Sequence, residues 1–438
     1  MKTSSEQHMP DLVVLSHLRW PWVWQRPQHL ISRLAATRLK GGARTFFVEE
    51  PLPADVPTPL LEMEEADGVV RVMLLVPERA GQPYLGFNDP GGLGYPARLR
   101  AALLRAGGRP NPDVWVYTPM ALPFLEALEP GLVIYDVMDD LASFAGAPRE
   151  MRERQLDLLA AADLVFTGGR SLHSSTTALR TADVHLFPSG VETSHYARAR
   201  TAKRPEKSTL VAGYIGVIDE RIDLALVAEL ARSLPDWTIR MVGPIAKIDR
   251  ADLPQAANIE YPGMVDYASL PDELARFDVA LMPFALNEAT SRISPTKTLE
   301  YFAAGLPVVS TRVPDVVADY GEHVHLADTG AAFAACCRQL AAASHNALSD
   351  PVRSLLRRQE WDFIAEAMED LVETTRSRAG EGQSYRRPFV AATRSATDDS
   401  AAMGKAFDEA HQPAVRVASD GIQNPLDGER LPTARGLR

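Results

Sequence analysis

Residues 294–310 read Ser-Pro-Thr-Lys-Thr-Leu-Glu-Tyr-Phe-Ala-Ala-Gly-Leu-Pro-Val-Val-Ser. The first half predicts a helix, because Ser294 is a good N-cap residue, Pro295 suits the first helical position, and no Gly or Pro interrupts 296–304. Gly305 is typical of the position that ends a helix. The Leu-Pro-Val-Val that follows indicates a short buried strand. The stretch therefore predicts a helix leading into a strand of an α/β sheet.

A basic and an acidic residue share one face of this predicted helix. Lys297 and Glu300 are three residues apart, so both side chains lie on the same side of the first turns. A helix N-terminus with a lysine beside it favours the binding of an anion. The carboxylate of Glu300 needs a polar partner, and ligand hydroxyls are suitable. The simpler alternative is a surface ion pair between the two, which contributes little energy.

Composition limits the classes of protein that fit the chain. It has 438 residues, 46% hydrophobic and 24% charged, so two globular domains and a tail fit better than one domain. The formal net charge of −11 argues against a broad nucleic-acid-binding surface. The two cysteines, Cys336 and Cys337, are adjacent, which suits neither a disulfide nor a metal site and indicates a reducing compartment.

The sequence also bears on the relation to membranes. Residues 1–10 lack the apolar core of a signal peptide, and no apolar run approaches the length of a membrane span. We therefore expect a cytoplasmic protein, and peripheral association with the inner face of the cell membrane stays open.

Short apolar segments alternate with helical patterns along the chain. After an apolar run at 12–15, further strands are expected at 45–48, 69–76, 114–118, 132–135, 164–167 and 184–187. A second alternation begins at residue 210 and continues with strands at 238–242, 258–261 and 279–282. Such alternation predicts α/β domains with doubly wound, mostly parallel sheets, which bind ligands at the carboxyl ends of their strands.

These patterns divide the chain into five expected segments. They are a flexible N-terminus at 1–10, an N-terminal domain at 11–192, a polar linker at 193–207, a C-terminal domain at 208–376 that includes helices at 331–343 and 351–375, and a disordered tail at 377–438. Two doubly wound domains in tandem enclose a cleft between their strand ends. That arrangement favours small-molecule chemistry between two bound groups, or ligand binding with domain closure.

A glycine turn opens the second alternation. Gly213-Tyr-Ile-Gly216 leads from a strand toward a helix, but it lacks the third glycine and the later acidic residue of a dinucleotide-binding fingerprint. The turn still suits a diphosphate, because backbone N–H groups and the guanidinium of Arg221 can neutralise charge together. The alternative is an ordinary strand-to-helix turn with a solvated arginine.

Acidic residues follow the expected strand at 132–135. Asp136, Asp139 and Asp140 could bind a hard cation, but they lack an Asp-x-Asp pair. Binding of substrate hydroxyls, or a structural role in a loop, are the alternatives.

Histidine and tryptophan side chains gather near the N-terminus. His29 lies in the first turn of a predicted helix beside Arg26, where it can carry a proton or donate to a hydroxyl, or can simply pack. Trp20, Trp22 and Trp24 precede this helix and can cover sugar faces or pack on their own domain.

Several motifs together are similar to a known family. They are His17-Leu-Arg-Trp, Gln25-Arg-Pro-Gln-His29, Tyr135-Asp-Val-Met-Asp-Asp140, Phe187-Pro-Ser-Gly-Val191, Tyr214-Ile-Gly-Val-Ile-Asp-Glu-Arg221, Met282-Pro-Phe284 and the whole run 287–310. With them the chain resembles the retaining GT-B-fold glycosyltransferases of the group 1, or family 4, type, from about residue 12 to residue 373. The resemblance is to the bacterial teichuronic-acid and surface-polysaccharide transferases.

The resemblance implies two Rossmann-like domains, with a nucleotide-sugar in the C-terminal one and the acceptor in the N-terminal one. It places Glu300 on the ribose, and Arg221 and Lys297 on the diphosphate leaving group, with Thr296 and the helix start assisting. It places Gly216 where the protein backbone can approach the ligand closely, and it places residues 263–265, with Gly263 and Val265, at the nucleobase. It assigns Arg26, His29 and Asp139 to the acceptor side.

Two departures from the family pattern concern the donor. The usual Glu eight residues before Glu300 is Arg292 here, and that Glu normally touches hydroxyls of the donor sugar. Glu288 and Asn287, just upstream, are the substitutes we expect, and Glu288 joins Arg221 and Lys297 in the expected catalytic set. The usual Lys-Gly after the first C-terminal strand is Arg221-Ile222, which keeps the charge in a fork that suits phosphate.

The expected function is transfer of a sugar from a nucleotide diphosphate donor to a glycan or lipid-linked acceptor, with retention of the anomeric configuration and no metal or other cofactor. A front-face reaction of this kind needs no protein nucleophile, only stabilisation of the departing diphosphate. The alternatives are a sugar-phosphate epimerase or phosphorylase and a non-catalytic nucleotide-sugar-binding partner, the last favoured by the departure at Arg292.

Overall fold

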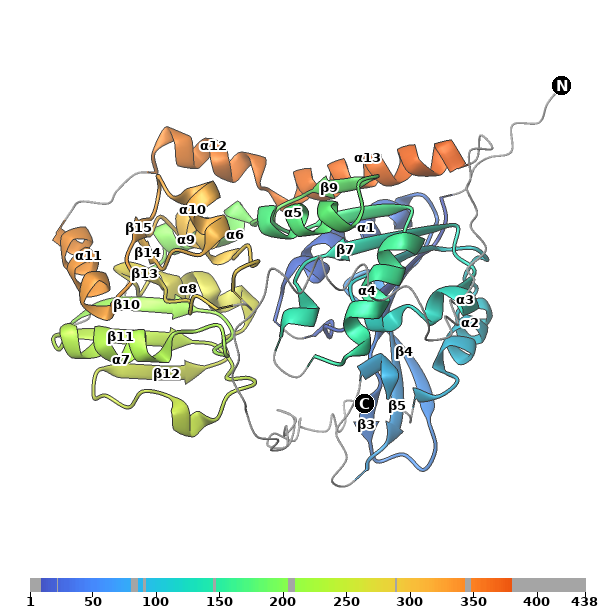
Figure 1. The fold of residues 1–438 in the computed structure, drawn as a ribbon, viewed down its shortest axis with the longest axis horizontal. Coiled ribbons are helices and arrows are strands. Elements are labelled where there is room, and N and C mark those ends of the chain that lie inside the picture. The colour runs from blue at the N-terminus through green and yellow to red at the C-terminus, as the bar shows by residue number, and fades with distance from the viewer. Residues whose placement is uncertain are drawn as a thin grey trace, which may run out of the picture.

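The structure is a computed structural model of the 438-residue chain. It describes residues 9–21, 23–79, 86–89, 92–144, 147–203, 209–287, 290–342 and 348–379. Within these residues the chain forms two α/β domains that lie side by side, each built on its own sheet (Figure 1). None of the described helices is long and apolar enough to cross a membrane.

The N-terminal sheet has nine strands within the described residues, in the order β3-β5-β2-β1-β6-β7-β8-β9, with β4 paired to β5. Their bounds are β1 (Leu12–Ser16), β2 (Thr45–Glu49), β3 (Leu52–Ala54), β4 (Leu60–Ala66), β5 (Val69–Pro77), β6 (Asp113–Val116), β7 (Leu132–Val137), β8 (Leu164–Thr167) and β9 (Val184–Leu186). All pairs are parallel except the β4–β5 hairpin. Asp67 and Gly68 form its turn with positive φ angles of 51° and 82°, as tight hairpins require.

Helices cover both faces of this sheet. They are α1 (Arg26–Lys40), η1 (Gly86–Asn88), α2 (Tyr95–Arg105), η3 (Pro119–Ala121), α3 (Phe124–Leu128), η4 (Leu141–Ser143), α4 (Glu150–Ala161) and α5 (Arg170–Leu179). One face forms a core with α2, α3, α4 and α5. The other forms a core with α1 and with the last helix of the described residues, α13 (Trp361–Arg378), which lies alongside α1 in Figure 1.

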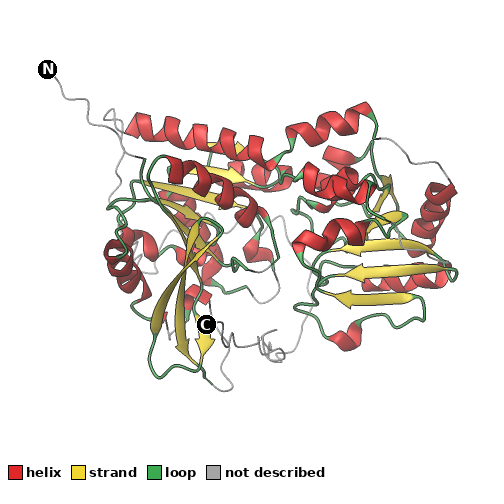
Figure 2. Cartoon of the chain, turned by 180° about the vertical axis from the view of Figure 1, so that it is seen from behind, coloured by secondary structure: helices red, strands yellow, loops and turns green. Residues whose placement is uncertain are grey.

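The C-terminal sheet is parallel throughout, in the order β12-β11-β10-β13-β14-β15 within the described residues. Its strands are β10 (Leu210–Ile215), β11 (Trp237–Val242), β12 (Ile259–Gly263), β13 (Val279–Met282), β14 (Val308–Ser310) and β15 (His325–Leu326). Its helical elements are α6 (Thr193–Ala197), η5 (Arg198–Arg200), α7 (Leu224–Ser233), η6 (Arg250–Asp252), η7 (Tyr267–Ser269), α8 (Leu270–Leu274), α9 (Lys297–Ala304), α10 (Pro314–Tyr320), α11 (Gly330–Ala342) and α12 (Asp350–Arg358). Figure 2 shows helices flanking the strands of both domains.

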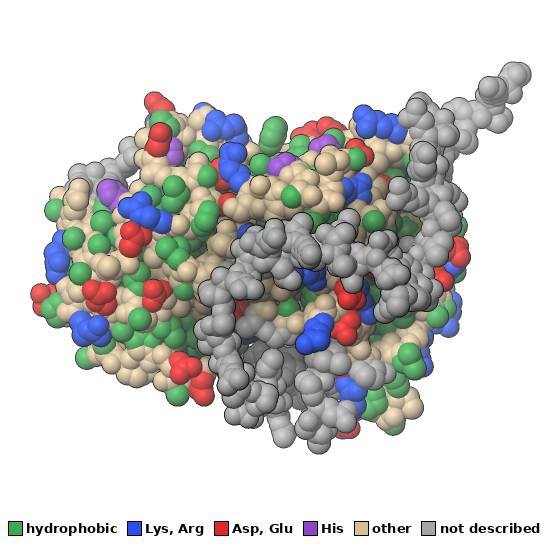
Figure 3. All heavy atoms as spheres, viewed as in Figure 1, with side chains coloured by type: hydrophobic (Ala, Val, Ile, Leu, Met, Phe, Trp, Pro, Cys, Tyr) green, Lys and Arg blue, Asp and Glu red, His purple; other side chains and the backbone are tan. Residues whose placement is uncertain are grey.

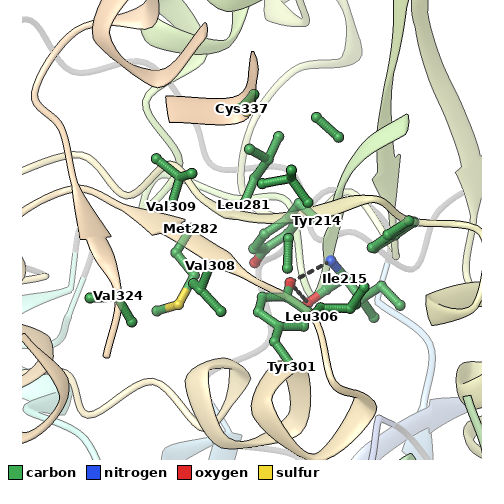
Figure 4. Close-up of a cluster of buried hydrophobic side chains, with 14 of the residues drawn as sticks. Tyr214, Ile215, Leu281, Met282, Tyr301, Leu306, Val308, Val309, Val324 and Cys337 are labelled. Atoms are coloured by element: carbon green, nitrogen blue, oxygen red, sulfur yellow. Dashed lines mark hydrogen bonds between the residues drawn. The ribbon is translucent and has the colours of Figure 1, made fainter. Parts of the chain in front are cut away.

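A buried tyrosine fixes α9 against the first strand of this sheet. The hydroxyl of Tyr301 accepts a hydrogen bond of 2.9 Å from the backbone N–H of Ile215 and lies 3.5 Å from its carbonyl oxygen (Figure 4). Gly305 ends α9 in the left-handed conformation, with φ of 78°, which confirms its predicted role. The helix was predicted to start at Pro295, but α9 begins two residues later, at Lys297. The strand that was predicted from Leu306 begins at Val308.

The chain crosses between the domains twice, at the same place. Val191 and Glu360 form a parallel bridge, in which the N–H of Val191 donates to the carbonyl of Gln359 at 2.7 Å. Gly190 allows this close approach, because a Cβ there would lie 2.8 Å from the Gln359 carbonyl oxygen and from the Trp361 ring. The two crossings thus form one hinge segment, which we define as residues 190–192 and 359–361.

The structure differs from the expected boundaries in two places. The start of the expected linker, 193–200, is helical, and Tyr196 and Ala199 are buried in the C-terminal core. The helix expected at 351–375 is two helices, and the second, α13, packs on the N-terminal domain rather than on the domain expected to extend to 376. Residues 1–8 and 380–438, which hold most of the two expected flexible ends, lie outside the described residues.

The surface in Figure 3 carries mixed charge. On the described part of this face, acidic and basic side chains are interspersed and do not gather into one basic patch. This distribution agrees with the net charge in giving no support for a nucleic-acid-binding face.

Candidate functional site

Two glycines bring the carboxyl ends of β10 and β11 into close contact. A Cβ on Gly243 would lie 1.9 Å from the carbonyl oxygen of Gly216, and a Cβ on Gly216 would lie 3.2 Å from Cε of Lys297. Their φ angles are 139° and 156°, in the region that glycine favours. Gly216, which the sequence analysis selected, is therefore next to Lys297. Gly243 was missed, although a glycine directly after a buried strand is the same signal.

Lys297 and Glu300 form an ion pair at the start of α9. Nζ of Lys297 lies 3.1 and 3.0 Å from the two carboxylate oxygens of Glu300. The simpler alternative predicted this contact, but it placed the pair on the surface, whereas the side chains are only 18% and 9% exposed. Burial, and then the negative charge of Glu300, raise the pKa of the nearby Tyr196. Glu300 is thus largely buried, between Lys297 and a tyrosine.

The first turn of α9, which carries this ion pair, has no side-chain cap from the residue before it. Thr296 has helical φ and ψ and makes no side-chain capping hydrogen bond. Ser294, the expected N-cap, lies two residues outside the cap position. The N–H of Leu299 already donates to the carbonyl of Thr296 at 3.0 Å, so among the described residues the N–H groups of Lys297 and Thr298 are the ones in this turn that can bind an anionic group.

Arg221 lies at the carboxyl end of β10, held by a neighbouring carboxylate. Its Nε contacts both oxygens of Asp219 at 2.9 and 3.0 Å, and its Nη2 contacts one of them at 2.7 Å. Burial alone would lower the pKa of Arg221, but hydrogen bonds and charge from Asp219, together with the charge of Asp139, raise it. The guanidinium is therefore fixed in place and positively charged, with a quarter of the side chain exposed.

Charged groups of the two domains meet opposite Arg221. Burial raises the pKa of Asp139 to about 6, and the positive charges of Arg221 and Lys247 oppose the shift. Burial, and then Lys247, lower the pKa of His17 to about 4. Nζ of Lys247 also lies 4.4 Å from the ring centroid of Phe144. The structure thus brings Asp139 of the N-terminal domain close to Arg221 of the C-terminal domain, and it adds His17 and Lys247, to which the sequence analysis gave no role.

Arg26 is not exposed on the acceptor side. It is 2% exposed, and its Nε lies 3.0 Å from both carboxylate oxygens of Asp136, while Nη1 donates to the carbonyl of Phe187 at 2.8 Å. A buried charge of this kind needs such partners, so Arg26 and Asp136 hold the interior of the N-terminal domain together. In the described part of the chain, no group of three His, Cys, Asp or Glu side chains is placed to hold a metal ion.

His29 belongs to an aromatic cluster that joins the two domains. It stacks on Trp361 of the hinge segment at 5.2 Å between centroids and packs edge-on against Trp24 and Tyr267. Tyr267, from the C-terminal domain, also stacks on Trp24 at 5.4 Å. Burial lowers the pKa of His29 well below its usual value, so the ring is neutral at physiological pH. The sequence analysis gave packing as the alternative role of His29 and the tryptophans, and packing accounts for His29 and Trp24. Trp22 lies outside the described residues.

The other residues expected on the donor side are Gly263, Val265, Asn287 and Glu288. Gly263 ends β12 with φ of 82°, and its carbonyl accepts from the N–H of Gly243 at 2.9 Å. Val265 packs on the edge of the C-terminal core. Asn287 is exposed, and its side chain accepts from the N–H of Thr290 at 3.1 Å, which makes it a turn residue. Glu288, the expected third catalytic residue, lies outside the described residues.

Arg292 reaches across to the N-terminal domain. Its Nη1 forms an ion pair with Oδ2 of Asp140, which also accepts a hydrogen bond of 2.8 Å from the hydroxyl of Ser143. The two side chains are 26% and 17% exposed. The departure from the family pattern at Arg292 thus puts a guanidinium between the domains, against Asp140.

A second set of contacts joins the domains at α5. The carboxylate of Asp315, on α10, accepts from the backbone N–H of Ser171 at 3.1 Å and from its hydroxyl at 2.5 Å. Arg170 forms an ion pair with Asp319 beside it. A Cβ on Gly169 would lie 2.8 Å from Cβ of Ser294. The start of α5 therefore rests directly on the C-terminal domain.

Comparisons with known proteins agree with this architecture. Residues 210–343 match the family model described as glycosyl transferases group 1. The chain is 28% identical over 277 residues, 57% of its length and 68% of the relative, to the putative teichuronic acid biosynthesis glycosyltransferase TuaH of Bacillus subtilis (strain 168).

Solved structures share the fold. An α,α-trehalose-phosphate synthase (UDP-forming) from Burkholderia xenovorans, in complex with glucose-6-phosphate, superposes with a TM-score of 0.61 at 13% identity, covering 83% of this chain and 100% of that one. Anabaena Alr3699/HepE in complex with UDP superposes with a TM-score of 0.56 at 13% identity, covering 83% and 100%. At these identities the likeness concerns the fold, which is the two-domain architecture called GT-B.

Proposed function

We propose that this chain, whose residues 210–343 match the family model of glycosyl transferases group 1, is a GT-B-fold glycosyltransferase that moves a sugar from a nucleotide diphosphate donor to a glycan or lipid-linked acceptor, with retention of configuration. The single observation that carries the proposal is the group formed by Gly216, Arg221, Lys297 and Glu300. They lie at the carboxyl ends of parallel strands and at a helix N-terminus, the two places where α/β proteins bind phosphorylated ligands.

The nucleotide replaces the internal ion pair in this proposal. Ribose hydroxyls donate to the carboxylate of Glu300, and Lys297 then turns from Glu300 toward the diphosphate. Gly216, which has no side chain, lets the phosphates approach the backbone. The exchange is favourable because Lys297 trades one anionic partner for a more highly charged one.

The departing diphosphate is stabilised by fixed positive charge. Asp219 holds Arg221 in one orientation, so the guanidinium needs little reorganisation when charge develops on the leaving group. Arg221, Lys297 and the start of α9 together supply this stabilisation without a metal ion. The acceptor hydroxyl attacks from the same face as the leaving group, the bond from the sugar to the diphosphate breaks as the glycosidic bond forms, and the carboxylate of Asp139 takes up the proton of the hydroxyl.

The proposal places the reaction on the cytoplasmic side of the cell membrane, in the synthesis of a cell-surface polysaccharide. The support for this role is the sequence similarity to a putative teichuronic acid biosynthesis glycosyltransferase.

A thermal-shift series tests the function. The full chain is heated with UDP, GDP or ADP, and with their sugars, each with and without EDTA. We expect one nucleotide to raise the melting temperature equally with and without EDTA. No shift with any nucleotide would contradict the proposal. Donor binding with no release of nucleoside diphosphate in the presence of glycan or lipid-linked acceptors would instead indicate a non-catalytic nucleotide-sugar-binding protein.

A further inference from the structure

Two tyrosines connect the carboxylate of Glu300 with the hinge segment. Tyr196 belongs to α6, which begins directly after the hinge segment, and it is 3% exposed in the C-terminal core. Tyr267 belongs to η7, and its hydroxyl donates to Oε2 of Glu192 at 3.1 Å. The two tyrosine rings meet edge to face, with 6.1 Å between their centroids and 85° between their planes. A row of polar groups thus runs from Glu192 through both tyrosines to Glu300.

Aromatic packing fixes the position of Tyr267. Its ring lies flat against the ring of His195, with 4.2 Å between the centroids, and it also stacks on Trp24 at 5.4 Å. A phenol has one hydrogen, and Tyr267 donates this hydrogen to Glu192, so its oxygen is left to accept from Tyr196. Burial raises the pKa of Tyr267, whereas the hydrogen bond with Tyr196 lowers it, as expected of an acceptor.

The hydroxyl of Tyr196 has one hydrogen and, among the described residues, two acceptors beside it. Burial, and then the charge of Glu300, raise the pKa of Tyr196, and hydrogen bonds to Tyr267 and Glu300 raise it further. A hydrogen bond to a carboxylate is charge-assisted and is therefore stronger than one to a neutral phenol oxygen. The hydroxyl of Tyr196 therefore favours Glu300, and burial of the tyrosine keeps water from taking its place.

Two side chains of different character thus hold Glu300. Nζ of Lys297 contacts both carboxylate oxygens, at 3.1 and 3.0 Å, and in the proposed function Lys297 turns toward the diphosphate when the nucleotide binds. Tyr196 is uncharged and buried, so the diphosphate does not draw it away. Once Lys297 has turned, the hydrogen bond from Tyr196 keeps the carboxylate in the orientation that the ribose hydroxyls need.

We propose that Tyr196 is a positioning residue, which holds the carboxylate of Glu300 toward the ribose and thereby makes the enzyme select ribonucleotides over deoxyribonucleotides. A carboxylate that is fixed in place loses its partners when the ligand lacks the ribose hydroxyls, because it cannot turn elsewhere. A site built to accept a hydrogen bond from a ligand hydroxyl rejects an analogue without that hydroxyl for this reason. The inference rests on the function proposed above.

Calorimetric titration of the full chain with two nucleotides tests the inference. The probes are UDP and 2′,3′-dideoxy-UDP, or the matching guanosine or adenosine pair when GDP or ADP is the nucleotide that binds. We expect Tyr196→Phe to lower the affinity for UDP about tenfold and the affinity for the dideoxy form less than about twofold. Phenylalanine keeps the buried ring, so circular dichroism should show an intact fold.

A double-mutant cycle shows whether Tyr196 acts through Glu300. In the Glu300→Gln background, Tyr196→Phe should lower the affinity for UDP less than about twofold, because the charged acceptor of its hydrogen bond is already gone. A further tenfold loss in that background would overturn the inference. Tyr95→Phe is the matched control, since Tyr95 is 1% exposed and donates one hydrogen bond of 3.1 Å to the carbonyl of Glu49 in the N-terminal domain. It should leave both affinities unchanged.

Tyr267→Phe should act in the opposite direction. It removes the acceptor that competes with Glu300 for the hydrogen of Tyr196, so UDP should bind at least as tightly as to wild-type protein. Glu192 loses a donor, but its side chain is 32% exposed and water can replace that hydrogen bond. If the tyrosines served only to pack the core, Tyr196→Phe and Tyr267→Phe would both lower the affinity, and the inference would be overturned. This variant also decides the matter if Tyr196→Phe does not fold.

The outcomes separate this inference from the proposed function. Equal affinity of wild-type protein for UDP and for the dideoxy form would overturn the inference, as would equal losses for both nucleotides in Tyr196→Phe. In either case nucleotide binding itself leaves the proposed function standing. Absence of any nucleotide binding to wild-type protein would remove the proposed function, and the inference with it.

Discussion

Asp315 of the C-terminal domain occupies the N-terminus of α5 in the N-terminal domain, where its carboxylate accepts from the backbone N–H and the hydroxyl of Ser171. It therefore caps a helix of the other domain, in place of Gly169, which makes no side-chain cap. Anions at helix N-termini are stabilised by the helix dipole, so this contact stabilises the observed contact between the two domains.

Asp315→Asn should weaken this contact between the domains. The amide retains one acceptor but loses the charge, and we expect the interface to lose about 1 kcal/mol. Small-angle scattering should then show a larger radius of gyration for the unliganded chain. Asp328→Asn, in an exposed pair with Arg312, is the control and should leave the radius unchanged. An equal radius for wild-type protein and Asp315→Asn would show that the contact does not hold the domains together.

Lys297→Ala and Glu300→Gln should each weaken binding of the nucleoside diphosphate. Each loses a charge-assisted contact to the ligand worth roughly 1.5–3 kcal/mol, so affinity should fall by roughly 10–100-fold in calorimetric titration. Circular dichroism should show an intact fold. Arg353→Ala breaks another i,i+3 ion pair, with Asp350 on α12, and serves as control. Unchanged affinity for the nucleoside diphosphate in both site variants would contradict the assignment of the donor site.

Gly243→Ala should be far more damaging than Gly263→Ala. A Cβ on Gly243 would lie 1.9 Å from a backbone oxygen that cannot move alone, whereas a Cβ on Gly263 meets nothing within 4 Å. We expect Gly243→Ala to lose more than about 3 kcal/mol of unfolding free energy, and Gly263→Ala about 1 kcal/mol from its positive φ. Urea unfolding measures both. Similar losses would mean that the two strand ends are less closely packed than described.

The activity should fall as the pH drops through about 6, because burial raises the pKa of Asp139 to that value. In the proposed reaction the ionised form takes up the proton of the acceptor hydroxyl, so kcat/KM should be highest above this pKa and should be lost below it. Asp139→Asn should remove the acidic limb and lower the plateau.

Glu50 provides the control for this pH profile. Burial raises its pKa to about 7, within the same range, but it lies in the N-terminal domain against Phe87. Glu50→Gln should therefore leave the acidic limb in place. A limb that disappears with Glu50→Gln and persists in Asp139→Asn would refute the role of Asp139.

The sequence predicted the fold where the signals are local. The alternation of buried strands and helices, the helix end at Gly305 and the strand after it all depend on residues within one turn or one pleat. The GT-B architecture was implied by the family resemblance, whose motifs are each short but extend from His17 to Ser310. The predicted α/β class and the GT-B fold are confirmed by the two sheets and by the solved structures that share them.

The sequence could not predict contacts between distant residues. Arg26 looked like a site residue, but its partner Asp136 is 110 positions away and buries it. Arg292 and Asp140 are 152 positions apart. The strand β4 was missed because its segment, Leu60–Ala66, contains three glutamates and lies largely exposed at the edge of the sheet. Periodicity indicated an apolar face on the last helix, but nothing local indicated which sheet receives it.

The return of α13 to the first domain has a consequence for synthesis on the ribosome. Trp361, Ile364 and Met368 complete a core that begins at Leu12, so the domain that emerges first is finished last. The intervening domain, by contrast, has all its strands and most of its helices in one continuous stretch. During translation the second domain can therefore reach its native packing while the first still exposes one apolar face, and a chain halted before residue 361 would carry a native C-terminal domain beside an incomplete N-terminal domain.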